Sequence, residues 1–234
     1  MDNNVGDAYN DVNGYFNRYA LTMPQRATPS SATAEGPRGY RPYHHGNLEL
    51  ELLAEAERTI REHGVEKLSL RELARATGVS HAAPRRHFPN RQALLDALAH
   101  QGFERLGAEL TDAMERAGDD FASRLAATAA AYVRFATTDA ALLELMFTGK
   151  HREPGGPLHD AAERTFGVMF ELILRGQRDG ALEAGEVDRV GLLLFATLQG
   201  IASLVNGGMI PAETLDELVP DATERFVRGA KPLG

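Results

Sequence analysis

Cationic side chains gather in one stretch of the sequence, from Ser69 to Phe88. Arg71 and Arg75 lie one helical turn apart there, and the run Arg85-Arg86-His87 follows after a short interval. Guanidinium groups form strong, charge-assisted hydrogen bonds with phosphate oxygens. The stretch is therefore a candidate surface for a polyanion, provided that the intervening residues hold these side chains on one face.

Two short helices joined by a glycine turn account for the residues between these cations. Ser69 and Glu72 have the spacing of a capping box, which predicts that a helix begins there. Gly78 is free to adopt a positive φ and end that helix, and Ser80 is placed to cap the next one. This layout is typical of a helix-turn-helix motif, whose second helix lies in the major groove of DNA. The alternative that the spacing leaves open is a helical hairpin with no nucleic-acid partner.

The charge distribution favours a phosphate-binding surface at one end of the chain. The formal net charge is −8, so the protein is acidic as a whole. Residues 38–91 nevertheless hold ten Arg and Lys against seven Glu, and the remainder therefore carries a net charge of −11. A basic region inside an acidic protein is the asymmetry expected of a confined nucleic-acid contact.

The amino-acid composition excludes several further kinds of site. The 234 residues are 43% hydrophobic, which is enough to fill a buried core, and none is Cys. Disulfides and thiolate metal sites are thus excluded, and adjacent His44 and His45 lack the spacing of paired metal ligands on a helix. The N-terminus lacks the charged segment and apolar run of a secretory signal. We expect a cytoplasmic protein without a metal or another cofactor.

The local composition divides the chain into three parts. Residues 1–40 are rich in Asn, Gly, Ser, Thr and Pro without an apolar period, and we expect a disordered tail there. Residues 41–95 are the predicted helix-turn-helix domain, and residues 96–230 are a larger helical domain. The basic, aromatic arm at 38–46, which includes Arg41, either lies along the minor groove of DNA or is a linker.

Apolar residues recur at helical spacing along the rest of the chain, without the alternation typical of strands. We therefore predict an all-α fold. Asn47, Asn90 and Asp139 are placed to cap helices, and Gly64 to end one. Pro220 is expected to kink or split the last segment, because it removes a backbone donor. Apart from the two short helices of the motif, the predicted helices are 47–63, 90–114, 121–136, 139–147, 159–179, 187–206 and 211–228, with a loop at 149–157.

One of these helices is apolar enough to raise the question of a membrane. No charged residue occurs from Val190 to Ile210, a length that approaches a membrane span. However, Thr197, Gln199 and Ser203 lower its hydrophobicity, and no basic flank marks a cytoplasmic side. Burial in the core, or against a second copy of the chain, explains the composition better.

Residues 47–100 resemble the DNA-binding domain of the tetracycline-repressor (TetR) family of bacterial transcriptional regulators. Phe195 to Gly200 also resembles the Trp-x-x-x-His-Gly signature of one subgroup of regulatory domains, with Phe195 in place of Trp and Gln199 in place of His. Inside the motif, Arg85 replaces the Tyr that is usual in the family, and Pro84 replaces a common apolar residue. The segments that carry the family resemblance are Gly64-Val65, Leu68–Ala74, Thr77–Ser80, His87–Arg91 and Ala93–Leu95.

The resemblance implies a homodimer that places two recognition helices in successive major grooves of a roughly palindromic operator. On that basis we expect His81 to contact base edges, while Ala82 and Ala83 let the helix approach closely. Arg85 is expected to bind phosphate in place of the family's Tyr, and Phe88 to fill the core. The full set of expected DNA-binding residues is Arg41, Ser69, Arg71, Ser80, His81, Ala82, Ala83, Arg85, Arg86, His87 and Arg91.

The resemblance also implies that a small molecule enters the C-terminal domain and shifts the dimer to a spacing that no longer fits DNA. Repression is the commoner behaviour in the family. An apolar or aromatic molecule is favoured, because the inner face carries no cluster of charges. Pocket and ordinary core remain alternative interpretations for each apolar residue involved. The candidate pocket residues are Phe103, Leu106, Leu110, Tyr132, Phe135, Met146, Phe147, Phe166, Met169 and Phe170.

A dimeric regulator, rather than an enzyme, is the resulting expectation. Ser80 with His81, or Glu163 with His159, lacks a third catalytic partner, and no phosphate loop or dinucleotide-binding motif is present. The alternatives are a helical enzyme and an interaction module that does not regulate transcription. The candidate dimer-interface residues are Leu194, Leu198, Ile201, Val205, Leu218 and Phe226.

Overall fold

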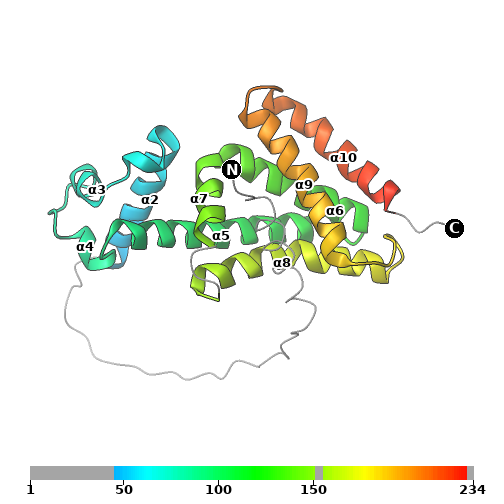
Figure 1. The fold of residues 1–234 in the computed structure, drawn as a ribbon, viewed down its shortest axis with the longest axis horizontal. Coiled ribbons are helices and arrows are strands. Elements are labelled where there is room, and N and C mark those ends of the chain that lie inside the picture. Colours follow the sequence, from blue (N-terminus) through cyan, green and yellow to red (C-terminus); the bar gives the residue numbers. More distant parts are fainter. Residues whose placement is uncertain (1–44, 151–154, 231–234) are drawn as a thin grey trace, which may run out of the picture.

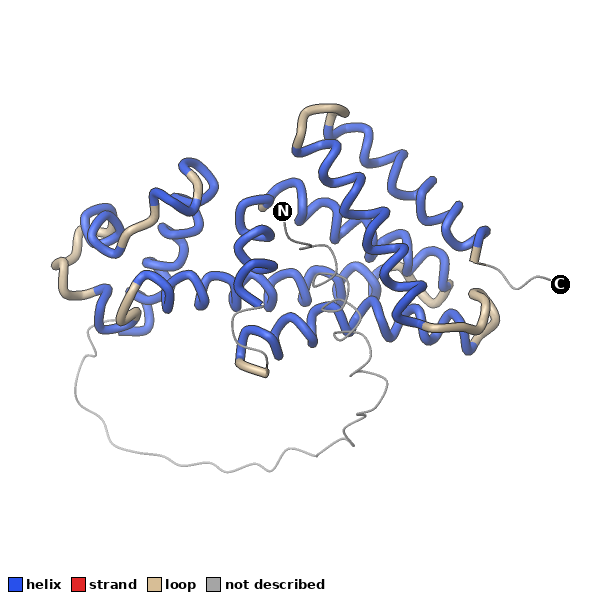
Figure 2. Tube along the Cα trace, in the orientation of Figure 1, coloured by secondary structure: helices blue, strands red, loops and turns tan. Residues whose placement is uncertain are grey.

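The computed structural model describes residues 45–150 and 155–230, and every regular element in these two ranges is a helix (Figure 1, Figure 2). The predicted all-α fold is therefore confirmed. The elements are α2 His45–His63, η1 Val65–Lys67, α3 Leu70–Ala76, α4 Pro84–His87, α5 Arg91–Arg116, α6 Phe121–Thr138, α7 Ala140–Lys150, α8 Pro157–Arg178, α9 Val187–Asn206, η2 Ala212–Thr214 and α10 Leu215–Gly229.

The long helix α5 is the axis of the molecule. Helices α2, α3 and α4 gather at its N-terminal end, and the rest of its length packs against α6, α7 and α8 (Figure 1). Helices α9 and α10 pack on α6 and lie away from α3 and α4 (Figure 1). We call α2–α4 the reading unit, and the assembly of α6–α10 around α5 the helical body.

A continuous stripe of buried side chains explains why α5 is so long. Its buried residues recur at helical spacing and include Leu94, Leu98, Phe103, Leu106 and Leu110, each at most 1% exposed. Burial of such a stripe stabilises a helix far more than the intrinsic propensities of its residues do. The stripe serves both parts of the molecule, so α5 connects the reading unit to the helical body without a break.

The local signals at several helix ends act as predicted. Asn90 Oδ1 accepts a hydrogen bond from the backbone N–H of Ala93 at 2.9 Å, which starts α5. Gly64 adopts φ +80° directly after α2 and ends it. Helix α2 begins at His45, two residues before the predicted cap Asn47. These short-range signals position the start of α5 and the end of α2, between which the motif lies.

Pro220 does not split the last helix, which corrects one part of the prediction. Helix α10 is continuous from Leu215 to Gly229 with Pro220 inside it. Val219 and Thr223 are buried on its inner face, and Thr223 Oγ1 donates to the carbonyl oxygens of Val219 and Pro220 at 3.1 and 2.9 Å. Packing of this face against α6 therefore outweighs the donor that proline lacks.

Helix α9 is, among the described residues, the helix that is long and apolar enough to cross a membrane. Here α9 packs against α6, α8 and α10, and Asn206 Nδ2 donates to the carbonyl oxygen of Ala136 on α6 at 3.0 Å. Its other face is open, because Leu193 and Leu204 are 58% and 38% exposed. One face of α9 thus belongs to the helical body, and its exposed face carries Leu193 and Leu204 beside small and polar residues such as Thr197 and Ser203.

Candidate nucleic-acid interface

Helix α3 begins at the predicted capping box. The backbone N–H of Glu72 donates to Ser69 Oγ at 3.2 Å, and the Ser69 hydroxyl donates to Glu72 Oε2 at 3.0 Å. Leu73 and Ala74 are buried, which fixes the rotation of the helix, while Arg71 is exposed. Ser69 is therefore the N-cap of α3, and its contact with DNA stays a prediction.

The turn after α3 is a Schellman motif. The N–H of Val79 donates to the carbonyl oxygen of Ala74 at 2.9 Å, and the N–H of Gly78 donates to that of Arg75 at 3.3 Å. Gly78 has φ +69°, a conformation that costs a residue with a Cβ atom about 1–2 kcal/mol. The predicted glycine turn is confirmed, and it sets the direction in which the chain leaves α3.

The second helix of the motif is shorter than predicted. Helix α4 spans only Pro84–His87, with Pro84 buried at its first position. Proline has no N–H to donate, and the carbonyl oxygen of Ser80 instead accepts from Ala83 N at 2.9 Å in a tight turn. Ser80 therefore starts a turn ahead of α4 and does not cap an α-helix. The prediction that Pro84 tightens this region is confirmed.

This turn and α4 present polar and cationic side chains to solvent. Ser80, His81 and Ala82 are exposed on the turn, and Arg85 and Arg86 are exposed on α4. Within residues 48–149 and 155–230, neither of the two guanidinium groups forms a hydrogen bond or an ion pair. Both are therefore available to an external acceptor such as phosphate.

Arg91, a predicted phosphate contact, is bound to the motif itself. Its Nε donates to the carbonyl oxygen of Leu68 at 3.0 Å, and its Nη2 donates to that of Val65 at 2.6 Å. Arg91 is the first residue of α5, and the two carbonyls lie between α2 and α3. The guanidinium thus holds this segment against the start of α5, which leaves fewer of its donors for DNA.

His87 and Phe88 lie on the inner side of the motif. His87 is half-buried, and its Nδ1 lies 3.4 Å from Glu49 Oε2 on α2. Phe88 is 3% exposed, which confirms the prediction that it fills the core. Ala83 is half-buried on the turn. Arg41, from the predicted arm, lies outside the described residues.

In the helical body, aromatic rings from five helices form one cluster. Phe166 lies at its centre, with ring centroids 6.1 Å from Phe103, 5.9 Å from Phe147 and 6.0 Å from Phe195. Tyr132 joins the cluster through Phe195, at 5.8 Å. The structure therefore brings together four of the predicted pocket residues. Phe195 was missed, although its place in the Trp-x-x-x-His-Gly-like segment was a signal for it.

A hydrogen bond from α6 to α9 lies beside this aromatic cluster. The Tyr132 hydroxyl donates to Gln199 Oε1 at 2.7 Å. Burial raises the pKa of the Tyr132 phenol, so the hydroxyl remains a protonated donor. Gln199, which was not among the predicted pocket residues, supplies a polar group there. The other predicted pocket residues are buried or half-buried in the core: Leu106, Leu110, Phe135, Met146, Met169 and Phe170.

The candidate dimer residues divide into two groups. Leu194, Leu198 and Ile201 are 1%, 2% and 7% exposed inside the protomer, so their side chains are not available to a second copy. The large apolar side chains that remain exposed on α9 are Leu193 and Leu204. The half-buried group is Val205, Leu218 and Phe226.

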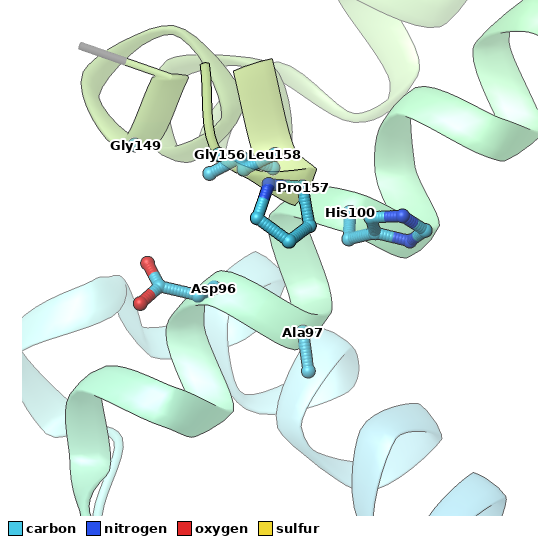
Figure 3. A pocket seen from close by; sticks show the side chains of 7 residues that line it. All are labelled: Asp96, Ala97, His100, Gly149, Gly156, Pro157 and Leu158. Atoms are coloured by element: carbon cyan, nitrogen blue, oxygen red, sulfur yellow. The ribbon is translucent and has the colours of Figure 1, made fainter. Parts of the chain in front are cut away.

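Two hollows lie beside α5, on the side of α8. A cavity of about 340 Å³ lies between one face of α5 and the ends of α7 and α8. Figure 3 shows the residues that line it. A shallow groove of about 460 Å³ runs between α5 and α8 and includes Phe103 of the predicted pocket. The residues around the first cavity are Asp96, Ala97, His100, Gly149, Gly156, Pro157 and Leu158.

The residue pairs considered for catalysis have ordinary settings. His159 Nε2 lies 3.2 Å from Glu163 Oε1, one turn along α8, and Ser80 and His81 lie on the exposed turn before α4. Among the side chains that the structure describes, no group of three or more His, Asp and Glu is placed to hold a metal ion. The clearest chemistry on the molecule is the cationic surface of the reading unit.

Both parts of the chain match described families. Residues 52–98 match the bacterial regulatory proteins of the tetR family, and residues 125–226 match the tetracyclin repressor-like C-terminal domain. No curated protein matches the chain.

Solved structures share the fold. A protein from Rhodococcus sp. RHA1, described as of unknown function, is 44% identical, with a TM-score of 0.75 over 82% of this chain and 100% of its own. A tetR-family regulatory protein from Rhodococcus RHA1 is 18% identical, with a TM-score of 0.63 over 80% of this chain and 98% of its own. A TetR-family transcription regulator from Marinobacter aquaeolei VT8 is 16% identical, with a TM-score of 0.66 over 80% and 97%.

The geometry of the described residues agrees with the family matches over residues 52–98 and 125–226. Residues 52–98, which match the first family, contain a capped helix, a glycine turn and a cationic second helix. Residues 125–226, which match the second family, belong to the helical body. The resemblance drawn from the sequence is confirmed. The chain belongs to the TetR family of bacterial transcriptional regulators.

Proposed function

We propose that the protein regulates transcription as a homodimer that binds a palindromic DNA operator. The turn and helix α4 of each copy enter the major groove of one half-site. The bound dimer represses, and a small apolar or aromatic molecule that binds in the helical body releases it. This role needs no catalytic group and no cofactor, and it belongs in the cytoplasm, where bacterial DNA lies.

The observation that carries the proposal is the exposed pair Arg85 and Arg86 behind the turn that Gly78 fixes. These guanidinium groups have no acceptor within the described residues, although the protein is acidic overall. Paired cations at a fixed distance from a rigid turn suit two phosphates of a duplex. An acidic protein gains nothing for its own stability from leaving them unpaired.

The expected contacts with DNA are of two chemical kinds, those to phosphates and those to base edges. Arg71, Arg85 and Arg86 suit phosphates, which orient the protein without reading sequence. His81 lies ahead of α4 with an exposed imidazole, and the exposed Ala82 beside it permits close approach to base edges or thymine methyl groups. Sequence selectivity should therefore depend on the turn before α4 more than on α4 itself.

The aromatic cluster around Phe166 supports an effector of aromatic or apolar character. Its rings offer edge and face contacts, and the Tyr132–Gln199 hydrogen bond supplies a donor and an acceptor at one side. A ligand that inserts there must separate rings or displace that bond, which moves α6 relative to α9. A complete switch requires the ligand to prefer one state by about 5.5 kcal/mol.

The dimer of this proposal forms through the open face of α9 and the adjacent edge of α10. Helix α9 is apolar in composition, yet only 28% of its most apolar window is buried in the protomer. An exposed apolar face of this kind on a soluble helix is typical of an interface. Leu193 and Leu204 are central candidates, with half-buried Val205, Leu218 and Phe226 at the edge.

The test begins with selection of duplexes from a random pool by the wild-type protein. The affinity of the selected operator is then measured against shuffled DNA at low and high salt. The variant Arg85→Ala plus Arg86→Ala should weaken binding to every duplex and reduce the slope of log K against log salt by about 0.9 for each phosphate contact removed. His81→Ala should instead relax the preference at particular operator positions.

A matched control separates local contacts from general charge. Arg175→Ala plus Arg178→Ala removes the same charge from the end of α8, in the helical body. This control should leave both the affinity and the salt slope nearly unchanged. Failure of the wild-type protein to select any sequence would defeat the proposal, as would equal losses in the two double variants.

A further inference from the structure

Four charged side chains join the reading unit to the helical body in a closed ring. Arg61 Nη2 donates to Glu57 Oε1 at 2.8 Å and to Asp139 Oδ1 at 2.6 Å. Arg105 Nη1 donates to the same Glu57 oxygen at 2.8 Å, and its Nη2 donates to Asp139 Oδ2 at 2.9 Å. Each carboxylate therefore lies between two guanidinium groups. We call Glu57, Arg61, Arg105 and Asp139 the hinge ring.

The hinge ring connects three parts of the chain that are distant in sequence. Glu57 and Arg61 lie on α2, Arg105 lies on α5, and Asp139 lies at the corner between α6 and α7. The bonds Arg61–Asp139 and Glu57–Arg105 thus cross from the reading unit to the helical body. A movement of α2 relative to that corner must stretch at least one of them.

The acidic members of the ring are well shielded from water. The side chains of Asp139 and Glu57 are 11% and 17% exposed, whereas those of Arg105 and Arg61 are 35% and 52% exposed. Arg105 also places its guanidinium carbon 5.0 Å from the ring centroid of Phe135 on α6. Shielded networks with several partners contribute more than isolated surface pairs, so this ring is a real constraint.

Apolar packing at this junction is interrupted on the side where the ring lies. A cavity of about 190 Å³ lies between α2 and the α6–α7 corner, and its lining includes Glu57, Arg61 and Asp139. The same lining includes Ile60 on α2 and Leu142 on α7. Close-packed helices transmit position through their side chains, whereas a gap leaves room for rotation. The polar bonds of the ring therefore act together with the buried Ile60 and Leu142 in setting the angle at this junction.

Helix α6 links the hinge ring to the aromatic cluster. Tyr132 of the cluster, Phe135 beneath Arg105, and Asp139 follow one another within two turns at the end of α6. Asp139 is the C-cap of α6, and its N–H donates to the carbonyl oxygen of Phe135 at 2.9 Å. A movement of α6 at Tyr132 would therefore also move Asp139, which lies at the end of the same helix.

We infer that the hinge ring is a positioning cluster that fixes the angle of the reading unit on the helical body, and thereby the half-site spacing that the dimer accepts. This inference rests on the proposed function. A dimer binds both half-sites well only when the two reading units are held at the matching separation. A loosened unit must be ordered on binding, which lowers affinity, but it also adapts to other separations.

The test compares Arg61→Gln and Asp139→Asn with wild type on three duplexes. These are the operator selected by the wild-type protein and two versions whose half-sites are moved apart or together by a single base pair. We expect each variant to bind the selected operator about fivefold more weakly. We also expect the penalty for altered spacing to shrink, a change that simple loss of stability would not cause.

Arg58→Gln is the matched control. Arg58 lies one turn before Arg61 on α2, its side chain is 57% exposed, and its acceptors Glu55 and Glu62 are on the same helix. The control loses one positive charge and its ion pairs but no bond to the helical body. Its affinity and its spacing penalty should both stay within about twofold of wild type.

Thermal unfolding of each variant accompanies the binding measurements. If Asp139→Asn does not fold, Arg61→Gln still decides the question, because Arg61 is half exposed and its loss leaves Asp139 paired with Arg105. Folded ring variants that keep both the wild-type affinity and the wild-type spacing penalty overturn the inference. A wild-type protein that selects no operator contradicts the proposed function instead, so the two failures are distinguishable.

Discussion

Arg91 donates from Nη2 to the carbonyl oxygen of Val65 at 2.6 Å, across the base of the helix-turn-helix motif. The bond joins the first residue of α5 to the 3₁₀ turn that precedes α3. The neighbouring residue, Asn90, caps α5 with its own side chain. Asn90 thus starts α5, and Arg91 beside it holds the segment that leads into α3. Arg91 is therefore a positioning residue.

Substitution of Arg91 should lower operator affinity without the signature of a lost phosphate contact. Arg91→Gln and Arg91→Lys both lose the paired bonds to Leu68 and Val65. We expect both to bind more weakly, with the slope of log K against log salt nearly unchanged. Arg85→Gln, in contrast, should reduce that slope by about 0.9. Full affinity in Arg91→Lys, together with a reduced slope in Arg91→Gln, would show that Arg91 binds phosphate after all.

Gly78→Ala should damage DNA binding more than its cost in stability explains. Gly78 and Gly118 have φ +69° and +80°, and a Cβ atom at either position would meet no neighbouring atom within 4 Å. Each substitution to Ala should therefore lower the free energy of unfolding by a similar ~1–2 kcal/mol, as urea titration would measure. Only Gly78→Ala should also weaken operator binding, because only Gly78 directs the chain into α4. Equal affinities for the two variants would contradict this.

The ion pair between α5 and α8 should make a pH-dependent contribution to stability. Arg164 Nη2 donates to Glu104 Oε1 at 2.8 Å, and this bond lowers the pKa of Glu104 from its usual 4.5. A carboxylate with a lowered folded-state pKa stabilises the protein above its unfolded-state pKa, and the contribution is lost as the pH falls through the folded-state value. Glu104→Gln should therefore cost ~0.2–1 kcal/mol at neutral pH, since both side chains are exposed. In urea titrations this difference should shrink as the pH falls from neutral through the folded-state pKa of Glu104, which lies below 4.5; a difference that stays constant over that range would have another origin.

Short-range signals made most of the reading unit predictable. The capping box at Ser69, the turn at Gly78 and the cap at Asn90 each act within a few residues, so the sequence identifies them directly. Pro84 predicted an irregular start of the second helix. The length of that helix, however, depended on the tight turn before it, which residue spacing does not specify. The acceptors of Arg91 lie more than twenty residues earlier in the chain, beyond what local patterns reveal.

The hinge ring and the dimer surface were not predictable for related reasons. Glu57, Arg105 and Asp139 meet only because α2, α5 and the α6–α7 corner converge, and no periodicity encodes that convergence. On α9 the difficulty was different, because the neighbouring residues Leu193 and Leu194 are equally apolar, yet one is 58% and the other 1% exposed. A hydrophobic pattern on both faces identifies a buried helix without saying which face belongs to the protomer.

Substitutions on the two faces of α9 should separate assembly from folding. Leu193→Glu and Leu204→Glu place a charge on the open face, so the protomer should fold but sediment as a monomer. Leu194→Glu places the charge in the protomer core, where an unpaired carboxylate is strongly unfavourable, and should prevent folding. Circular dichroism reports the helix content, and sedimentation velocity reports the mass.

Operator binding then links assembly to function in the same variants. A folded monomer keeps an intact reading unit but loses the second half-site, so Leu193→Glu should bind a full operator hardly better than a single half-site. Thr197→Ser, which changes an exposed position on the same helix without adding charge, should remain dimeric and retain the full advantage. A Leu193→Glu protein that remains dimeric would place the interface elsewhere on the helical body. The exposure of Leu193 and Leu204 on α9 would then need another explanation.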